Sequence, residues 1–397
     1  MRWWLATLRR LDGTDEYSGI RYGEEVMHGI TRLLALCLLT GWHNGAAEPP
    51  DTGISGVYEV MVGVEDAGPA LAYFAEFGFS VTASAEMPAD RAARVYGVDS
   101  ALRSIRLQNG ATDAHGLLRV LEWATPLGPG VGFAPPHTVG TRMAVMRTTD
   151  IFRLADVFAD LRDGAGEVWL LAGPVYDDLY NATEGTPSIA NRRVGVREMA
   201  VYGQWFNHVF FQRYGYTIPG YGVIGEHSPL GTSEFTHHDF VVAGNLAEVT
   251  DYYETVFGFI PENDPVINGA WQAGPQVVFQ MEQGRSHWYR GFVSPNDVSG
   301  KLKFFSQEGL HVADDRSERQ RPGELGITLH SLWMPRLEQV HGLAEAAGLE
   351  VGDVQRNEFD EQSFLVRGPD GASWQIIQRE QSLTRPVTQL ELVDVNN

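Results

Sequence analysis

Residues 234–259, EFTHHDFVVAGNLAEVTDYYETVFGF, contain the pattern that decides the fold. Their first third alternates in the manner of a β-strand and carries two adjacent histidines. Asn245 and Glu248 then have the spacing of a capping box, which marks the start of a helix. Apolar residues recur behind the cap at helical spacing, and Gly258 stands where a helix end favours a left-handed residue. The stretch therefore predicts a strand, a helix and the start of a second strand.

The same plan recurs along the chain, with a strand and a helix followed by about three strands in each copy. The four copies begin at Val57, Gly140, Glu234 and Gly326. A unit of this size cannot bury both faces of its sheet, so we expect the copies to pair into larger sheets. The segments between copies at 126–138 and 217–233 are rich in glycine and proline, which is typical of linkers.

This fourfold plan resembles the vicinal oxygen chelate superfamily, which includes glyoxalase I, extradiol dioxygenases and bleomycin-resistance proteins. The recurring Gly-Phe after the helices and the closing stretch 369–377, PDGASWQII, contribute to the resemblance, which covers roughly residues 56–380. It implies an α+β fold in which four βαβββ modules pair into two glyoxalase-like half-barrel domains.

The predicted organisation follows from the modules and linkers. It consists of a leader with a signal segment at 1–55, a first domain of two modules at 56–216, a linker at 217–233, a second domain of two modules at 234–382 and a C-terminal tail at 383–397.

Composition excludes several classes of function. The net charge of −21 argues against binding to nucleic acid, because that needs clustered positive charge. The chain has one cysteine, Cys37, which rules out disulfide frameworks, cysteine-ligated zinc and iron–sulfur clusters within a single chain. Lys301 and Lys303 are the only lysines, so a Schiff-base mechanism is improbable.

The first fifty residues have the order of a secretory signal. An apolar run at 33–39 follows Arg32 and precedes small residues at 45–47, while being too short to span a membrane. An alternative start of translation at Met27 would shorten the segment that precedes the apolar run. The prediction is a periplasmic or secreted protein with no membrane segment after processing. The alternative is a helical extension on a cytoplasmic protein.

The resemblance places metal-ligand positions on the first and last strands of each module. In modules 1 and 2 these positions hold Glu59, Arg119, Met143 and Asn207. Met143 and Asn207 are poor ligands for a hard cation, and Arg119 is itself a cation. Arg119 and Glu59 instead predict a salt bridge across the barrel.

In modules 3 and 4 the resemblance implies a metal site formed by His238, His330 and Gln375, where extradiol-type members have two histidines and a glutamate. Gln375 departs from that pattern, since an amide is a weaker ligand than a carboxylate. Glu282, Glu361 and Glu380 are candidate replacements. The implied cofactor is a divalent metal (Fe, Mn, Ni or Zn). The alternative is no cofactor, with these residues lining a polar pocket.

The alternation of side chains along a strand predicts which of the remaining histidines face the pocket. His237 and His208 are each one residue out of step with a site position, so we expect them to face away from the pocket. His287 and Tyr289 lie on or beside a strand of the third module and are candidate acid–base groups. Ordinary barrel lining is the alternative for both.

These observations lead to two functional hypotheses and a weaker third. The first is a metal-dependent lyase or dioxygenase that binds a small oxygenated organic substrate in the C-terminal barrel. The second is a metal-free protein that binds or sequesters a small molecule, like bleomycin-resistance proteins. The third is a structural role. The G-x-G-x-x-G match at 220–225 lacks a following helix and is interpreted as linker. The oligomeric state is left open, with a homodimer as one option.

Overall fold

The computed structural model describes residues 49–110, 115–165, 170–181, 193–203, 205–262, 266–268, 273–280, 287–307, 315–380 and 391–392. The predicted signal segment, Cys37, Glu282 and nearly all of the C-terminal tail lie outside these residues. No helix in the described ranges combines the length and apolar character needed to cross a bilayer.

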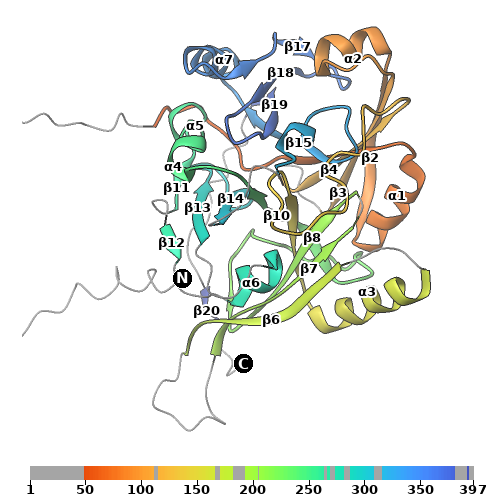
Figure 1. Ribbon diagram of the computed structural model, residues 1–397, viewed down its shortest axis with the longest axis vertical. Coiled ribbons are helices and arrows are strands. Elements are labelled where there is room, and N and C mark those ends of the chain that lie inside the picture. The colour runs from red at the N-terminus through yellow and green to blue at the C-terminus, as the bar shows by residue number, and fades with distance from the viewer. Residues whose placement is uncertain are drawn as a thin grey trace, which may run out of the picture. The chain divides into compact units, whose positions relative to one another are not determined.

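The four predicted modules are present (Figure 1). Module 1 contains β1 (Glu59–Val64), α1 (Ala67–Glu76), β2 (Phe79–Met87), α2 (Ala89–Tyr96), β3 (Leu102–Asn109) and β4 (Leu117–Trp123). Module 2 contains β5 (Arg142–Thr148), α3 (Ile151–Ala165), β6 (Leu170–Asn181), β7 (Arg193–Tyr202) and β8 (Asn207–Tyr214). Module 3 contains β10 (Thr232–Val241), α4 (Leu246–Val249), α5 (Tyr252–Thr255), β11 (Ile260–Pro261), β12 (Val266–Asn268), α6 (Ala273–Phe279), β13 (His287–Val293) and β14 (Lys301–Gln307). Module 4 contains β15 (Gly326–Met334), α7 (Leu337–Ala346), β16 (Glu350–Val351), β17 (Gln355–Arg356), β18 (Gln362–Arg367) and β19 (Ser373–Gln378). Outside the modules lie β9 (Tyr216–Thr217), β20 (Glu391–Leu392) and a 3₁₀ turn, η3 (Ser317–Arg319).

The modules pair differently from the prediction. Modules 1 and 4 form one nine-stranded sheet, sheet I, in which β1 pairs antiparallel with β15. Modules 2 and 3 form a second nine-stranded sheet, sheet II, in which β5 pairs antiparallel with β10. The prediction that 56–216 and 234–382 are separate paired domains is therefore wrong. The repeats show where modules lie in the sequence, but the choice of partner depends on long-range strand pairing.

The local signals in the opening stretch are confirmed, with one difference. Asn245 accepts a hydrogen bond from the backbone N–H of Ala247 and donates to Glu248, and Gly258 has a φ of +82°. The predicted single helix is divided into α4 and α5. Thr250, at the division, donates to the Leu246 carbonyl and accepts from Arg290 Nη1.

Each sheet has two apolar faces with different partners. Helix α1 packs on sheet I and helix α3 packs on sheet II, and both join one core that includes Phe74, Phe158 and the β10 residue Phe235. Helices α4, α5 and α7 pack on the same side of the sheets around Phe240 and Trp374. We call these helix-covered faces convex. The opposite, concave faces carry separate clusters, so each sheet encloses a half-barrel of its own.

Two segments expected to be peripheral belong to the packed body. Ile54 is fully buried in the α4/α5/α7 core, and Ser55 exchanges hydrogen bonds with the backbone of Trp333. Residues 54 and 55, which the prediction assigned to the leader, are therefore part of the folded body. In the predicted linker, the N–H groups of Gly222 and Val223 donate to Glu234. These amides are satisfied by the chain's own carboxylate, which agrees with the interpretation that 220–225 is not a phosphate loop.

The contact between modules 1 and 3 depends on a close backbone approach at Gly300. Its φ is +69°, and a Cβ there would lie 2.2 Å from the backbone nitrogen of Val57. We predict that Gly300→Ala lowers the free energy of unfolding by at least about 1–3 kcal/mol, because both the backbone angle and the space oppose it. Gly342→Ala in α7, where no atom lies within 4 Å of the added Cβ, should raise it by up to about 1 kcal/mol. Urea unfolding of both variants checks this, and equal effects would contradict the interpretation.

Candidate functional site

The concave face of sheet I holds a closed polar network centred on the guanidinium of Arg119. Arg119 Nη1 lies 2.7 Å from Gln375 Oε1 and 3.1 Å from Glu358 Oε1, and Nε lies 3.1 Å from Glu59 Oε1. Arg119 Nη2 also donates to Glu59 Oε2. The side chains of Arg119 and Glu59 are fully buried, as predicted for a salt bridge across the barrel.

Further side chains satisfy the remaining atoms of this network. Ser331 donates to Glu59 Oε2 at 2.7 Å, Tyr96 donates to Glu358 at 2.6 Å, and Gln375 Nε2 donates to Tyr96. Burial alone would raise the pKa of Glu59, but Arg106 and Arg119 together lower it to about 2. The network therefore contains a permanent cation, Arg119, and a carboxylate, Glu59, that is ionised at physiological pH.

The concave face of sheet II holds charged groups that are not paired in this way. Asp239 on β10 is only 5% exposed, and its Oδ1 has no hydrogen-bond partner among the residues that the structure describes. Burial raises the pKa of Asp239 to about 7, although neighbouring Lys303 acts in the opposite direction. The carboxyl group is thus able to gain or lose a proton near neutral pH.

Lys303 on β14 is the second member of this group and is Asp239's register partner. Burial opposes its charge, yet Tyr289, Asp239 and Glu262 raise its pKa. Among the described residues, no carboxylate oxygen lies within 4.0 Å of its ammonium group. Lys301, two residues earlier, differs because its ammonium lies 2.7 Å from Glu262.

Histidine and tyrosine side chains surround these two charges. His237 Nδ1 lies 2.6 Å from the Tyr221 hydroxyl, and its Nε2 lies 3.9 Å from Asp239. Burial lowers the pKa of His237 well below its usual value, with Lys303 adding to the effect, so the ring is neutral. Tyr289 is half-buried on the same face and contacts Phe305.

An apolar wall adjoins this polar group. It is formed by Met143, Tyr202, Val278, Phe279 and Phe305, with α6 packed on β6 and β7. The Tyr202 hydroxyl donates to the Val278 carbonyl, which fastens α6 to the sheet. Apolar walls with a few convergent polar groups are typical of small-molecule sites.

The order and direction of the strands in the two sheets identify the fold. In both sheets the first strands of two βαβββ modules pair antiparallel, and each has the last strand of its own module beside it in parallel (Figure 1). The chain has the vicinal oxygen chelate fold. The resemblance noted in the sequence is thereby confirmed at the level of the fold.

Comparison with known proteins finds similar solved structures at low sequence identity. No protein-family model matches the sequence, and no curated protein matches it. Similar solved structures include glyoxalase I from Zea mays, with 10% identity over 81% of this chain and 92% of that one and a TM-score of 0.47. A glyoxalase family protein from Bacillus cereus has 16% identity over 40% of this chain and 93% of that one, with a TM-score of 0.28. A bleomycin resistance determinant encoded on transposon Tn5 has 12% identity over 34% and 91%, with a TM-score of 0.22.

The residues present on the two concave faces do not fit the divalent metal of metal-dependent vicinal oxygen chelate proteins. In sheet I the guanidinium of Arg119 already binds the oxygens of Glu59, Glu358 and Gln375. In sheet II the corresponding strands contribute Met143, Asp239 and Lys303, a set with only one anionic ligand. Within the part of the chain that the structure describes, no group of three or more His, Cys, Asp or Glu side chains could hold a metal ion.

The predicted metal site of His238, His330 and Gln375 is wrong as a set. His330 lies on β15 beside Ser331, so its side chain points to the convex side, whereas Gln375 lies on the concave side with Ser331. His238 and His330 do meet, with ring centroids 5.0 Å apart, but they are packed among Phe240 and Trp374. Burial lowers the pKa of His238 to about 3.

The other predicted residues divide between the two sheets. His287 and Tyr289 lie on alternate positions of β13, and Tyr289 contributes to the sheet II cluster. Glu361 supports the Arg119 network by pairing with Arg106 at 3.0 Å. His208 is fully buried among phenylalanines on the convex side, which agrees with its predicted exclusion from the pocket. His237 was expected to face away and instead lines the concave face.

Sequence reasoning missed Asp239 and Lys303. A usable signal was present, since both lysines of the chain stand two residues apart in KLKFF, which places them on one face of a strand. It is unusual for an acidic protein to have both of its lysine side chains on one face of a single strand. Asp239 would have followed only from the correct strand register.

The Arg119 network yields a stability prediction. Glu59→Gln should lower the free energy of unfolding by about 3–5 kcal/mol at pH 7, because the change leaves a buried guanidinium undercompensated. The folded-state pKa of Glu59 is depressed, so its contribution is present above the usual value of 4.5 and is lost as pH falls towards 2. The difference from wild type in urea unfolding should therefore shrink over that range. Glu345→Gln, at an exposed carboxylate near His341, should change stability by less than about 0.5 kcal/mol at either pH.

Proposed function

We propose that the concave face of sheet II binds a small oxygenated organic molecule without a divalent metal, and that the Lys303 ammonium supplies the positive charge. The observation that carries this proposal is the adjacency of Lys303 and Asp239 without a direct ion pair. Asp239 is buried with an unpartnered oxygen and Lys303 is half-buried, so both groups have lost hydration without gaining an ion pair with each other. A bound oxygen atom would supply the missing partner.

The surroundings of Lys303 suit such a ligand. Its register neighbour Asp239 offers an unsatisfied oxygen, and the Tyr289 hydroxyl lies on the same face. The Met143–Phe305 wall accommodates carbon atoms, while the polar groups orient carbonyl, carboxylate or hydroxyl oxygens. This favours a carboxylate or carbonyl compound over a purely apolar drug.

Asp239 adds a second candidate function, acid–base catalysis next to a carbonyl. Its carboxylate accepts a proton from the carbon beside the carbonyl, and the C–H electron pair moves into the new C=C bond. The carbonyl oxygen becomes an enolate that Lys303 stabilises, and return of the proton to a different position gives an isomer. The pKa of Asp239, raised to about 7 by burial, supports this role because the base works near neutral pH.

The two lysines allow a matched test of ligand binding. Wild-type protein is titrated with pyruvate, lactate, 2-oxoglutarate, benzoate and catechol, with thermal shift and calorimetry as readouts. Lys303→Met should weaken binding of the responding compound at least tenfold, whereas Lys301→Met, which removes an ammonium already paired with Glu262, should retain it. Equal losses in both variants, or no response of wild type to any compound, would contradict the proposal.

Catalysis is tested separately with Asp239→Asn. For a compound that binds, exchange of the hydrogen next to its carbonyl in D₂O is followed by NMR. Wild type should catalyse exchange, and the variant should bind with similar affinity while exchange falls by a factor of about 10² or more. Binding without exchange in wild type would leave the protein as a binding protein.

Asp239 also predicts a pH-dependent stability effect. Its pKa is raised in the folded state, so between about pH 4 and 7 the folded protein binds more protons than the unfolded one, and its contribution to stability falls as pH rises. Asp239→Asn should therefore be more stable than wild type at pH 8, with about 1.4 kcal/mol for each unit of pKa shift as the upper bound. The advantage should disappear near pH 4. A constant difference across this range would show that Asp239 does not titrate as described.

A further inference from the structure

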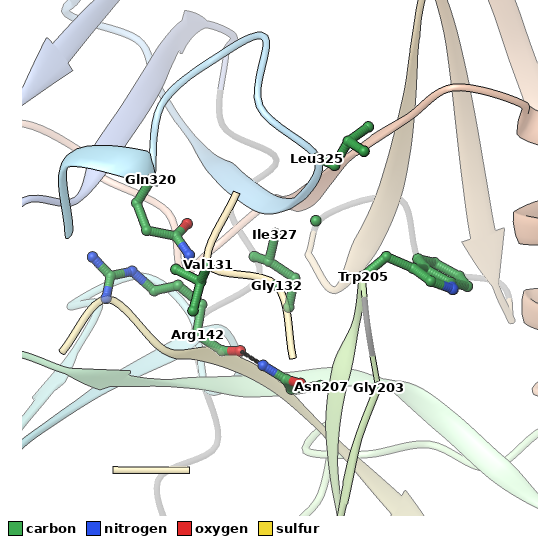
Figure 2. Close-up of a pocket in the computed structure, with 10 residues that line it drawn as sticks. Val131, Gly132, Arg142, Gly203, Trp205, Asn207, Gln320, Leu325 and Ile327 are labelled. Atoms are coloured by element: carbon green, nitrogen blue, oxygen red, sulfur yellow. Dashed lines mark hydrogen bonds between the residues drawn. The ribbon is translucent and has the colours of Figure 1, made fainter. Parts of the chain in front are cut away.

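A small cavity beside Arg142 has no room for an organic ligand (Figure 2). Its volume is about 20 Å³, enough for about one water molecule, whereas sites for small organic molecules span roughly 300–1,000 Å³. Figure 2 shows Asn207, which lines this cavity, donating to the backbone carbonyl of Arg142 at 3.1 Å. Further ligand contacts therefore belong to the concave face of sheet II, where a hydrogen-bonding group beside Asp239 remains unused.

Four polar residues form a two-by-two array on that face. His237 and Asp239 stand two residues apart on β10, so their side chains share the face. Their register partners on the parallel strand β14 are Lys301, which is paired with Glu262, and Lys303. Neighbours along one strand face are separated by roughly 7 Å and register partners by roughly 5 Å. His237 is therefore adjacent to Asp239 and diagonal to Lys303, the two groups of the proposed site.

The imidazole of His237 is held in place by aromatic neighbours. Its ring centroid lies 6.0 Å from that of Tyr221, with an interplanar angle of 18°, and 5.8 Å from that of Phe211. Its Nε2 lies 3.9 Å from Asp239 Oδ1, too far for a hydrogen bond. Among the described residues no hydrogen-bond partner meets Nε2, and unlike both nitrogens of His238 it is not completely enclosed. Nε2 is therefore available to a ligand.

The contacts of Nδ1 assign the hydrogen of the neutral ring to Nε2. Tyr221 lies closest, at 2.6 Å, and a phenol is a stronger proton donor than a neutral imidazole, so the hydroxyl donates to Nδ1. Thr236 Oγ1 lies 3.1 Å from Nδ1, and its own hydrogen is donated to the Val145 carbonyl, so it does not compete with Tyr221 as a donor. On the other side of the ring, the Asp239 carboxylate favours a hydrogen on the nitrogen that faces it. His237 thus presents an N–H group to the site.

The ring donates this hydrogen bond without a charge of its own. Burial lowers the pKa of His237 well below its usual value, and Lys303, His238, Lys301 and Arg213 add to the effect. A neutral imidazole keeps its N–H hydrogen at neutral pH, so it stabilises an oxygen that becomes negative without transferring a proton to it.

We propose that His237 is the hydrogen-bond donor to the carbonyl oxygen of the sheet II ligand and that Tyr221 positions it. This inference rests on the proposed function and narrows its ligand class. Two donors on a diagonal, His237 Nε2–H and the Lys303 ammonium, match two acceptor oxygens on neighbouring carbon atoms. The ligand class is therefore a 2-oxo carboxylate, with its carbonyl on His237 and its carboxylate on Lys303.

The assigned chemistry is enolisation of that ligand. Asp239 takes a proton from the carbon next to the carbonyl, the C–H electron pair forms the C=C bond, and the C=O pair moves onto the oxygen bound to His237. Return of the proton from Asp239 restores the starting compound, or gives the deuterated compound in D₂O.

The first experiment reads the tautomer and needs no ligand. In full-length protein with ¹⁵N-labelled histidine, NMR correlates ring hydrogens with ring nitrogens between pH 6 and 8. His237, identified by the signals missing in His237→Gln, should be neutral with its hydrogen on Nε2. Tyr221→Phe should let the Nδ1–H form appear, whereas Tyr176→Phe, at an exposed tyrosine on β6, should not. An Nδ1–H form or an imidazolium in wild type, or an unchanged tautomer in Tyr221→Phe, would overturn the inference.

The second experiment uses pyruvate, with calorimetric affinity and exchange of its methyl hydrogens in D₂O as readouts. Glutamine has an amide N–H near the position of Nε2–H, so His237→Gln should keep both within about fivefold of wild type. His237→Phe should lower affinity at least tenfold, and His237→Asn, whose amide is too short to reach, decides the matter if that variant does not fold.

The two experiments separate the possible failures. Equal losses in His237→Gln and in the variant without a donor would overturn the role of His237 while leaving the proposed function intact. The same holds for wild type that binds pyruvate but has the Nδ1–H tautomer. Wild type that responds to none of the titrated compounds would overturn the proposed function and this inference with it.

Discussion

The antiparallel pairing of first strands, β1 with β15 and β5 with β10, determines which side chains each half-barrel can use. Glu59 is opposite Ser331 in sheet I, and Asp239 is opposite Met143 in sheet II. Since successive residues of a strand face opposite sides, a shift of one residue would exchange the concave and convex sets. His330 would then replace Ser331 beside the Arg119–Glu59 pair, and a neutral core histidine would lie in a charged network.

The features that the sequence predicts correctly are local or recur within one module. Asn245 and Gly258 mark the helix limits through backbone chemistry that operates over a few residues. The pairing of Arg119 with Glu59 follows because both residues belong to module 1. The choice of modules 1 and 4 as partners depends on strand contacts across more than 200 residues, which no periodicity in the sequence encodes.

The facing of the histidines was mispredicted because the aligned positions in modules 3 and 4 were one residue out: Asp239 lies opposite Met143, and Ser331 lies opposite Glu59. The pairing of β10 with β5 is irregular between Thr232 and Phe235 and again between Phe235 and His237. As a result Phe235 and Phe240, an odd number of residues apart, both lie in convex-side cores. An extra residue reverses the parity of the residues after it, so the strand register decides which face each side chain takes.

The two concave faces each carry a cation, but the two cations differ in how they are paired. Each has a fixed cation on the last strand of a module, Arg119 on β4 and Lys303 on β14. Arg119 is enclosed by two carboxylates and an amide oxygen, so its charge is neutralised locally and stabilises sheet I. Within the described part of the chain, Lys303 has a carboxylate neighbour but no ion pair, and that carboxylate has an unsatisfied oxygen. Asp239 is buried and Lys303 is half-buried, so this partly desolvated pair in sheet II, beside a saturated network in sheet I, supports the proposal that sheet II is the half that binds a ligand.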